Sequence, residues 1–151
     1  MSTTTENFEI KIVNHIDEID ITTINHLLCK LTGREYAITT DDLQKMLDDR
    51  NSQLFIATAD NKTIGMASLG TYLAPTGHKA WIEDVVVLPQ MQGQGIGRKL
   101  IEHIIDFVNH HMTPCSLMLT SHPSRIAAND LYRNVGFEQR NTNVYKMAIE
   151  E

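Results

Sequence analysis

Several specialised protein classes are excluded by what this 151-residue sequence lacks. Its 8 glycines and 4 prolines are too few for a collagen-like or low-complexity chain. No apolar run reaches the ~20 residues of a membrane span. The two cysteines, Cys29 and Cys115, lie far apart in apolar stretches, so we expect free, buried thiols and no metal site. The first residues lack the basic and apolar regions of a secretory signal, so we expect a cytoplasmic protein.

Basic residues are in the minority, since 13 Lys and Arg stand against 19 Asp and Glu, a formal net charge of -6. Binding to nucleic acid depends on neutralising phosphates, so this balance argues against a nucleic-acid partner. It favours a cationic partner such as an amine. Any anionic ligand must be held by local donors, because the overall field opposes it.

Hydrophobic residues make up 42% of the chain, which fits one globular domain of ordinary size. No internal repeat, linker or compositional break divides the sequence. We therefore expect a single domain over residues 1–151, in which residues 1–7 form a flexible N-terminus.

The spacing of apolar residues predicts both strands and helices. Alternation predicts strands over residues 8–13, 54–59, 63–73, 79–88, 115–120, 137–139 and 144–149. Helical spacing predicts helices over residues 17–31, from a cap at Thr39 or Thr40 to Leu47, over 95–111 and over 124–135. We expect an α/β (α+β) fold, with a mixed, mostly antiparallel central sheet of about seven strands flanked by about four helices.

The segment after the fourth predicted strand is rich in glycine and reads Gln92, Gly93, Gln94, Gly95, Ile96, Gly97, Arg98. Glycines let backbone N–H groups approach a ligand, and the following helix adds unpaired N–H groups and the positive end of its dipole. Together they predict a phosphate or pyrophosphate site. The segment does not match the Rossmann fingerprint G-x-G-x-x-G, because counting from Gly93 puts Arg98 where the third glycine is required. The sequence also contains no Walker A motif. The alternative is a turn needed only for packing, to which Arg98 and Lys99 would be superfluous.

Two sequence blocks carry a resemblance to a known family. The string Q-G-Q-G-I-G, directly after V-V-V-L-P, resembles the R/Q-x-x-G-x-G/A motif of the GNAT superfamily of acyl-CoA-dependent N-acetyltransferases. Residues 127–137, A-A-N-D-L-Y-R-N-V-G-F, resemble the family's A-x-x-L-Y-x-x-x-G-F block. The resemblance is specific over residues 81–137 and holds only in outline over residues 1–51. It implies an acetyl-CoA-dependent enzyme that transfers acetyl directly to a primary amine of a small molecule or peptide. Small members of this fold are often homodimers.

The resemblance also implies which residues hold acetyl-CoA. The pyrophosphate would lie on the backbone between Gln92 and Arg98. The pantetheine arm would bond the backbone of Val85, Val86 and Val87, in a strand splayed by a bulge. Many members have Asn seven residues before the helix tyrosine, where this sequence has Arg125. Either Asn129 replaces that residue, or Arg125 pairs with a phosphate.

The resemblance implies two catalytic roles. Glu83, in the strand W-I-E-D-V-V-V, would be the general base for the amine, directly or through water. Backbone N–H groups of residues 85–87 would stabilise the oxyanion. Tyr132 would protonate the departing thiolate. The alternatives are that Glu83 only faces solvent, that Asp84 is the base, and that Tyr132 is only a core aromatic.

Two other functions compete with the enzyme. One is a non-catalytic acyl-CoA-binding sensor or partner module, and the other is a phosphate-binding structural domain. The acceptor stays open among amino sugars, polyamines, amino acids and proteins. We expect residues 17–50 and 73–78 to recognise it, and His122 is a weaker candidate.

Overall fold

The computed structural model describes residues 7–151. Residues 1–6, most of the segment expected to be a flexible N-terminus, lie outside the described residues. The chain divides into two compact units at Thr120 and Ser121, and each is described by itself. The single domain over residues 1–151 stays a prediction.

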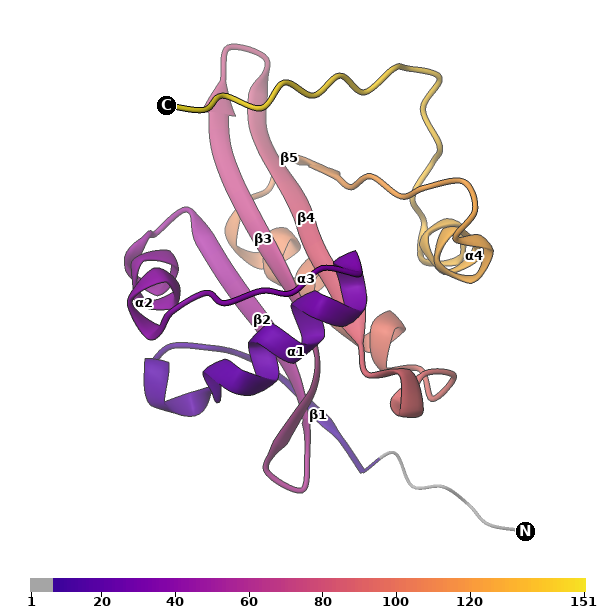
Figure 1. Cartoon of the computed structure of the whole chain (residues 1–151). Coiled ribbons are helices and arrows are strands. Elements are labelled where there is room, and N and C mark those ends of the chain that lie inside the picture. The colour runs from indigo at the N-terminus through magenta and orange to yellow at the C-terminus, as the bar shows by residue number, and fades with distance from the viewer. Residues whose placement is uncertain (1–6) are drawn as a thin grey trace, which may run out of the picture. The chain divides into compact units, whose positions relative to one another are not determined.

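The first unit is built on a five-stranded sheet with the order β1-β2-β3-β4-β5 (Figure 1). The strands are β1 (Glu9–Ile12), β2 (Ser52–Ala59), β3 (Lys62–Ala74), β4 (Gly77–Val87) and β5 (Cys115–Met118). The first three pairings are antiparallel, and β4 pairs with β5 in parallel. This confirms the expected mixed, mostly antiparallel sheet.

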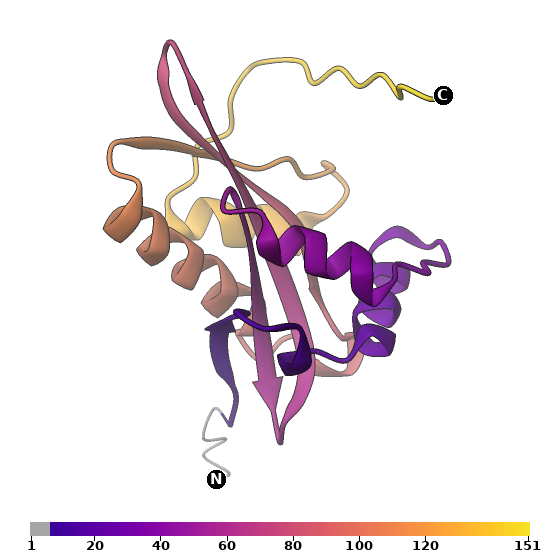
Figure 2. The same cartoon turned by 90° about the vertical axis from the view of Figure 1, so that its left-hand side faces the viewer.

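Helices cover both faces of this sheet. They are α1 (Ile21–Thr32), α2 (Thr40–Asp48) and α3 (Ile96–His111). Two short 3-10 helices, η1 (Ile16–Glu18) and η2 (Pro89–Met91), precede α1 and α3. Figure 2 shows the purple α1 and α2 on one side of the sheet and the orange-brown α3 on the other.

Helix boundaries follow from side-chain caps. Helix α1 begins later than the expected residue 17, because the Asp20 carboxylate accepts from the Thr22 N–H at 3.0 Å and fixes the N-terminus there. The helix ends at Gly33, which adopts φ 71°. Thr39, one of the two expected caps, accepts from the Asp42 N–H, whose carboxylate bonds back in a capping box.

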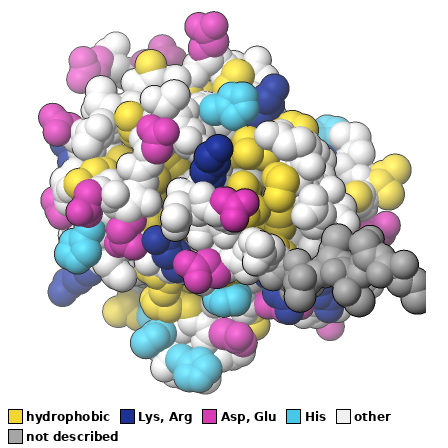
Figure 3. Space-filling model, turned by 90° about the horizontal axis from the view of Figure 1, so that it is seen from below, with side chains coloured by type: hydrophobic (Ala, Val, Ile, Leu, Met, Phe, Trp, Pro, Cys, Tyr) yellow, Lys and Arg dark blue, Asp and Glu magenta, His cyan; other side chains and the backbone are white. Residues whose placement is uncertain are grey.

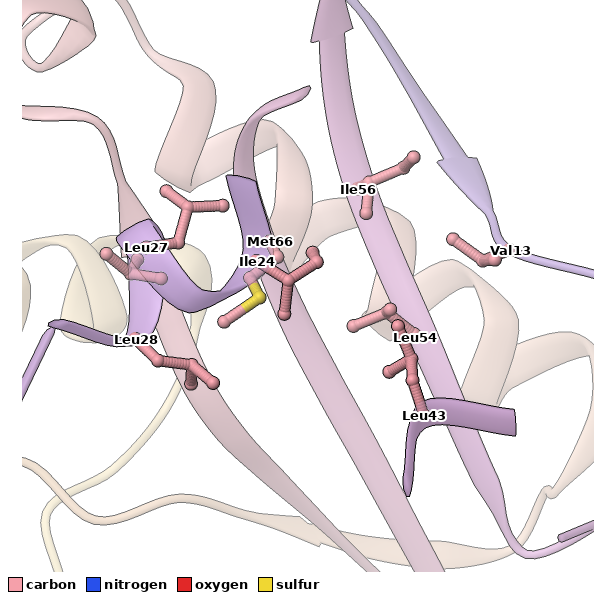
Figure 4. Close-up of a cluster of buried hydrophobic side chains, with 9 residues drawn as sticks. Val13, Ile24, Leu27, Leu28, Leu43, Leu54, Ile56 and Met66 are labelled. Atoms are coloured by element: carbon pink, nitrogen blue, oxygen red, sulfur yellow. The ribbon is translucent and has the colours of Figure 1, made fainter. Parts of the chain in front are cut away.

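The core has a layer on each side of the sheet. Figure 4 shows one layer, in which Ile24 and Leu27 of α1 meet Leu54 and Ile56 of β2 and Met66 of β3. The other layer holds the buried side chains Phe55, Leu69, Leu100, Ile101 and Ile104. There Phe55 packs edge-on against Phe107 of α3, with ring centroids 5.7 Å apart. Side chains alternate between the two faces along each strand, so every second residue faces the same helix layer.

The second unit contains one helix, α4 (Ile126–Val135), which ends at Gly136 with φ 113°. It starts two residues later than expected, because Arg125 is its N-cap.

The expected strands over residues 137–139 and 144–149 are wrong, so the structure has five strands between residues 7 and 151 instead of about seven. A segment with alternating apolar residues forms a strand only where a neighbouring strand can pair with it. Here Val144, Tyr145, Met147 and Ile149 are all more than two-thirds exposed.

Across the described chain, none of the helices combines the length and the apolar character that crossing a bilayer requires.

Candidate active site

Strand β4 carries a bulge beside the expected base. Ser68 of β3 pairs with Glu83, but Met66 pairs with Val86, so Asp84 and Val85 together oppose Ala67. Asp84 adopts φ 52°, a left-handed conformation that is uncommon for residues other than glycine. The expected bulge is confirmed: it follows Glu83 and includes Val85, the first of the three valines.

Beyond the bulge, β4 has a free backbone side. The β4–β5 ladder covers only His78 to Trp81, so β5 does not pair with the valine segment. The Leu88 N–H donates to the Ile64 carbonyl at 2.9 Å. In an antiparallel strand, the N–H and C=O groups of successive residues point alternately toward the partner strand and away from it. Val86, like Leu88, therefore points its backbone groups toward β3, and Val87 points its backbone groups away. The Val87 carbonyl accepts instead from Nε2 of Gln92, at 3.2 Å.

The glycine segment forms an exposed loop before α3. Gly93 has φ 80° and Gly95 has φ 82°, conformations that favour glycine. Gly95 is the N-cap and supplies no side-chain cap. The Lys99 N–H is bonded to the Gly95 carbonyl at 3.0 Å, so the amides of Ile96, Gly97 and Arg98 precede the first intrahelical bond. Such a helix start attracts an anion.

Sequence reasoning missed Gly65 of β3, which lies against the end of β4. A Cβ at Gly65 would stand 3.1 Å from the Val86 carbonyl oxygen, 3.3 Å from Cγ2 of Val87 and 3.5 Å from Cγ2 of Ile96. The first two of these contacts are tight, so Gly65 lets the end of β4 lie close to β3, while the contact with Ile96 of α3 is an ordinary van der Waals distance. No local pattern could have found this role, because its contacts are distant in the chain.

The two basic residues of the loop are paired along the helix. Nε of Arg98 contacts Oε1 of Glu102 at 2.7 Å, and Nζ of Lys99 lies 3.5 Å from Oε2. The hydrogen bond from Arg98 is the main cause that lowers the pKa of Glu102. On the face shown in Figure 3, Lys and Arg side chains lie among Asp and Glu side chains. An anion at the loop therefore relies chiefly on backbone N–H groups.

Two carboxylates stand side by side at the bulge. Partial burial raises the pKa of Glu83, and the Asp84 carboxylate raises it further. Burial also raises the pKa of Asp84. The Ser68 hydroxyl donates to the Glu83 carbonyl at 3.1 Å, which ties this backbone to β3. A carboxyl with a raised pKa binds a proton more readily, as a general base requires.

In the second unit, Asn129 holds the turn before α4. Its Nδ2 lies 2.7 Å from the Arg125 carbonyl, 3.0 Å from the His122 carbonyl and 3.4 Å from the Ser121 hydroxyl. Nδ1 of His122 accepts from the Ser124 N–H at 3.1 Å within the same turn. The amide hydrogens of Asn129 are thus committed to structure.

Tyr132 of α4 is buried, with 7% of its surface exposed. Its ring packs edge-on against Phe137, with centroids 6.2 Å apart. Burial raises the pKa of the Tyr132 phenol, and the Arg125 guanidinium acts in the opposite direction. The phenol therefore keeps its proton at neutral pH and can only donate it.

The first unit brings together one group of expected site residues and the second unit another. Glu83, the valines and the glycine loop belong to the first unit, and Arg125, Asn129 and Tyr132 belong to the second.

Among the described residues, no group of three or more His, Cys, Asp and Glu side chains is arranged to hold a metal ion.

A comparison with known protein families identifies the class of protein. A model of the acetyltransferase (GNAT) family matches residues 21–137, more than half of the chain. The chain therefore belongs to the GNAT acetyltransferase family, whose members use acetyl-CoA as co-substrate and are acyltransferases. No curated protein matches the sequence significantly.

Solved structures share the fold at low sequence identity. An aminoglycoside acetyltransferase from an uncultured soil metagenomic sample, in complex with trehalose, is 22% identical with a TM-score of 0.81, covering 96% of this chain and 99% of that one. Glucosamine-6-phosphate N-acetyltransferase from Arabidopsis thaliana is 18% identical with a TM-score of 0.78, covering 94% and 99%. An acetyltransferase from Trypanosoma brucei is 20% identical with a TM-score of 0.76, covering 93% and 99%. These similarities establish the fold alone.

Proposed function

We propose that this protein is an acetyl-CoA-dependent N-acetyltransferase that moves acetyl directly from the thioester to a primary amine of a small molecule or peptide. The observation that supports the proposal is the bulge in β4, which directly follows Glu83 and leads along the chain to a strand segment with a free backbone side and then to the glycine loop. Two similar structures are named for amine acceptors, an aminoglycoside and glucosamine-6-phosphate, which supports the reaction type.

The residues present fit the co-substrate. The N–H groups between Gly93 and Arg98 would hold the diphosphate, as the positive φ of Gly93 and Gly95 leaves the loop backbone open. The pantetheine arm would bond the outward backbone of Val87, with Val85 in the bulge beside it. Val86 would contribute packing, since its backbone faces β3. Gln92 would then exchange its bond to the Val87 carbonyl for a contact with the ligand.

At the second unit, Arg125 is the better candidate for a contact with the co-substrate. Its guanidinium presents five donors in a planar fork that suits phosphate. Asn129 would act by holding the turn that positions Arg125, because its amide already bonds three acceptors.

In the proposed reaction, Glu83 takes a proton from the acceptor, directly or through water, so that the amine nitrogen has a free electron pair. That nitrogen bonds to the thioester carbonyl carbon, and N–H groups freed by the bulge stabilise the oxyanion. The carbonyl then re-forms as the carbon–sulfur bond breaks, the nitrogen releases its second proton to water, and Tyr132 gives its phenolic proton to the thiolate. The tyrosinate regains a proton from the solvent. A thiol pKa of ~8.5 and a phenol pKa of ~10 make this transfer only mildly uphill before burial is considered.

The decisive experiment compares the wild type with Glu83→Gln and Tyr132→Phe. Thiol release from acetyl-CoA is followed with amino sugars, polyamines, amino acids and a peptide, and calorimetry measures CoA affinity. We expect turnover to fall about 10²-fold or more in each variant while CoA affinity holds. CoA binding with no turnover on any amine would favour the non-catalytic acyl-CoA-binding module instead, and no binding would refute both.

A further inference from the structure

Six residues of the β3–β4 hairpin lie on one face of the sheet. Glu83 pairs with Ser68, two residues along β3 from the core residue Met66, so this is the face that carries α1 and α2. Continuing along the ladder, the cross-strand pairs on this face are Ser68 with Glu83, Gly70 with Trp81, and Tyr72 with Lys79.

Much of this face is free of the helices of the first unit. The hairpin extends beyond α1 and α2 (Figure 1), and Tyr72 is 52% exposed. A Cβ added at Gly70 would meet no heavy atom within 4 Å. Opposite the half-buried Trp81, β3 therefore offers open space rather than a packed side chain, which is room for the body of a ligand next to an indole ring.

Charge changes sign along this face. Lys79, Trp81 and Glu83 follow one another at every second position of β4, about 6.7 Å apart, so the acid and the cation are separated by about 13 Å of strand. At the cationic end, a hollow of about 450 Å³ is lined by Arg50, Asn51, Tyr72, Leu73 and His78. Arg50 thus adds a second permanent cation near the Tyr72–Lys79 pair.

We propose that the acceptor is a dipolar amine, in which an apolar or planar body joins the primary amine to a carboxylate or phosphate about a nanometre away. This inference rests on the proposed function, because it places the amine at Glu83. The body would lie against Trp81 in the space above Gly70, and the anion would lie between Lys79 and Arg50 beside Tyr72. A second ammonium at that end would be repelled, so linear polyamines fit poorly.

Lys79 and Arg50 compensate for the unfavourable overall charge of the protein. With a net charge of -6, the molecule as a whole repels a carboxylate or phosphate. Lys79 on this face and Arg50 in the hollow beside Tyr72 provide positive charge at the same end of the hairpin, which a purely cationic acceptor would not need. The order of acid, aromatic ring and cations therefore selects for opposite charges at the two ends of the ligand.

The test compares acceptors of equal length in the full-length protein. Thiol release from acetyl-CoA is measured with 8-aminooctanoate, 8-aminooctyl phosphate, octylamine and 1,8-diaminooctane. We expect kcat/KM for at least one of the two dipolar amines to exceed that for octylamine about 10-fold or more, and diaminooctane to be the poorest. The carboxylate and phosphate arms show which anion is preferred.

Charge variants assign the preference to the hairpin. In Lys79→Gln and Arg50→Gln, the ratio of kcat/KM between the preferred dipolar amine and octylamine falls toward one. In Lys62→Gln, which removes an exposed lysine at the other end of β3, the ratio keeps its wild-type value. Equal rates for dipolar and simple amines, or a ratio that survives in both Lys79→Gln and Arg50→Gln, would overturn the inference while leaving the acetyltransferase proposal intact.

A binding measurement keeps this inference separate from catalysis. Thermal shifts with the same four amines are recorded in the presence of CoA. If no amine is acetylated, the proposed function fails, and a larger shift with the dipolar amines that is lost in Lys79→Gln still supports the dipolar site. Equal shifts with all four amines would refute it.

Discussion

At the scale of single residues, neighbours in the sequence can have different positions and different roles in the candidate site. Glu83 and Asp84 are neighbours in the chain, yet only Glu83 shares a face with Trp81 and Lys79, because side chains alternate between the two faces of a strand. Gly93 and Gly95 matter through their backbone angles and not through contacts, since a Cβ at either would meet nothing within 4 Å. The candidate site is thus defined by the charge of a side chain, the face of the strand on which it lies, and the backbone angles of the glycines.

The raised pKa of Glu83 predicts an acid limb in the activity profile. The base works only when deprotonated, so kcat/KM should rise as the pH increases through this pKa and then level off until another group titrates. Glu83→Gln should be slow at every pH and should lose this limb. Initial rates between pH 4.5 and pH 8 check the prediction, and an unchanged limb in the variant would assign it to another group such as Asp84.

The same shift predicts the stability of that variant. Because the folded state holds the Glu83 proton more tightly than the unfolded state, stability falls as the pH rises from the unfolded pKa through the folded pKa. At neutral pH the charged carboxylate therefore costs stability. Glu83→Gln should melt at the wild-type temperature or above it, and Asp84→Asn should behave likewise. A clearly lower melting temperature would show that the carboxylate makes stabilising contacts.

Replacing Gly95 by Ala should separate backbone strain from ligand binding. A side chain at φ 82° costs about 1–2 kcal/mol, and the strain is relieved by moving the loop N–H groups. We expect Gly95→Ala to lower the unfolding free energy and to weaken CoA binding about 10-fold. Gly33→Ala is the matched control, because Gly33 has φ 71° at the end of α1 and should lose stability alone. Equal CoA affinity in Gly95→Ala and wild type would remove the loop from the site.

At the scale of elements, the sequence predicted most helices and strands but few of their contacts. Alternation and capping signals located β1 to β5 and α1 to α4, because these signals are local. The bulge came from a family resemblance, since W-I-E-D-V-V-V has no internal sign of an extra residue. The bond from Gln92 to the Val87 carbonyl and the triple role of Asn129 could not be predicted, because they depend on how a loop folds back.

Gly65 gives an element-scale prediction, because a side chain there would press against the end of β4 at Val86 and Val87. Gly65→Ala forces a Cβ against the Val86 carbonyl, so we expect a loss of about 1–3 kcal/mol in unfolding free energy and weaker CoA binding. Gly70→Ala, where the added Cβ meets open space, should keep its stability or gain slightly. Denaturant unfolding and calorimetry compare the two. Equal stabilities would show that the end of β4 at Val86 and Val87 can shift at no cost.

At the scale of the whole molecule, sequence reasoning went wrong where pairing partners decide the structure. Residues 144–149 alternate as a strand does, yet their apolar side chains are exposed and the segment is not a strand. Periodicity reports which side of a strand would be buried, but not whether a free sheet edge exists to receive it. The number of strands was therefore the least predictable property of the fold.

The overall charge predicts an unusual salt dependence. A site built from basic side chains loses affinity for a polyanion as salt is added. In the proposed site, backbone amides would bind the diphosphate while a net charge of -6 repels it, so the two effects of screening would oppose each other. We expect the Kd for CoA to change less than about threefold between 50 and 300 mM NaCl. A steep loss of affinity would mean that Arg98, Lys99 or Arg125 carries most of the binding.

The extra residue in β4 also decides which way the valines point. In a regular strand, positions 83 and 86 face opposite sides, but here the Glu83 and Val86 side chains share one face because Asp84 and Val85 together oppose Ala67. Deleting Asp84 would restore simple alternation and place Val86 two positions after Glu83, so Val86 would stay in the apolar cluster that it shares with Met66, and Val87 would stay on the opposite face. A one-codon deletion would thus remove the local distortion of the backbone at Asp84 without exchanging the two sides of the strand end, which separates the effect of the extra residue on backbone geometry from its effect on side-chain direction.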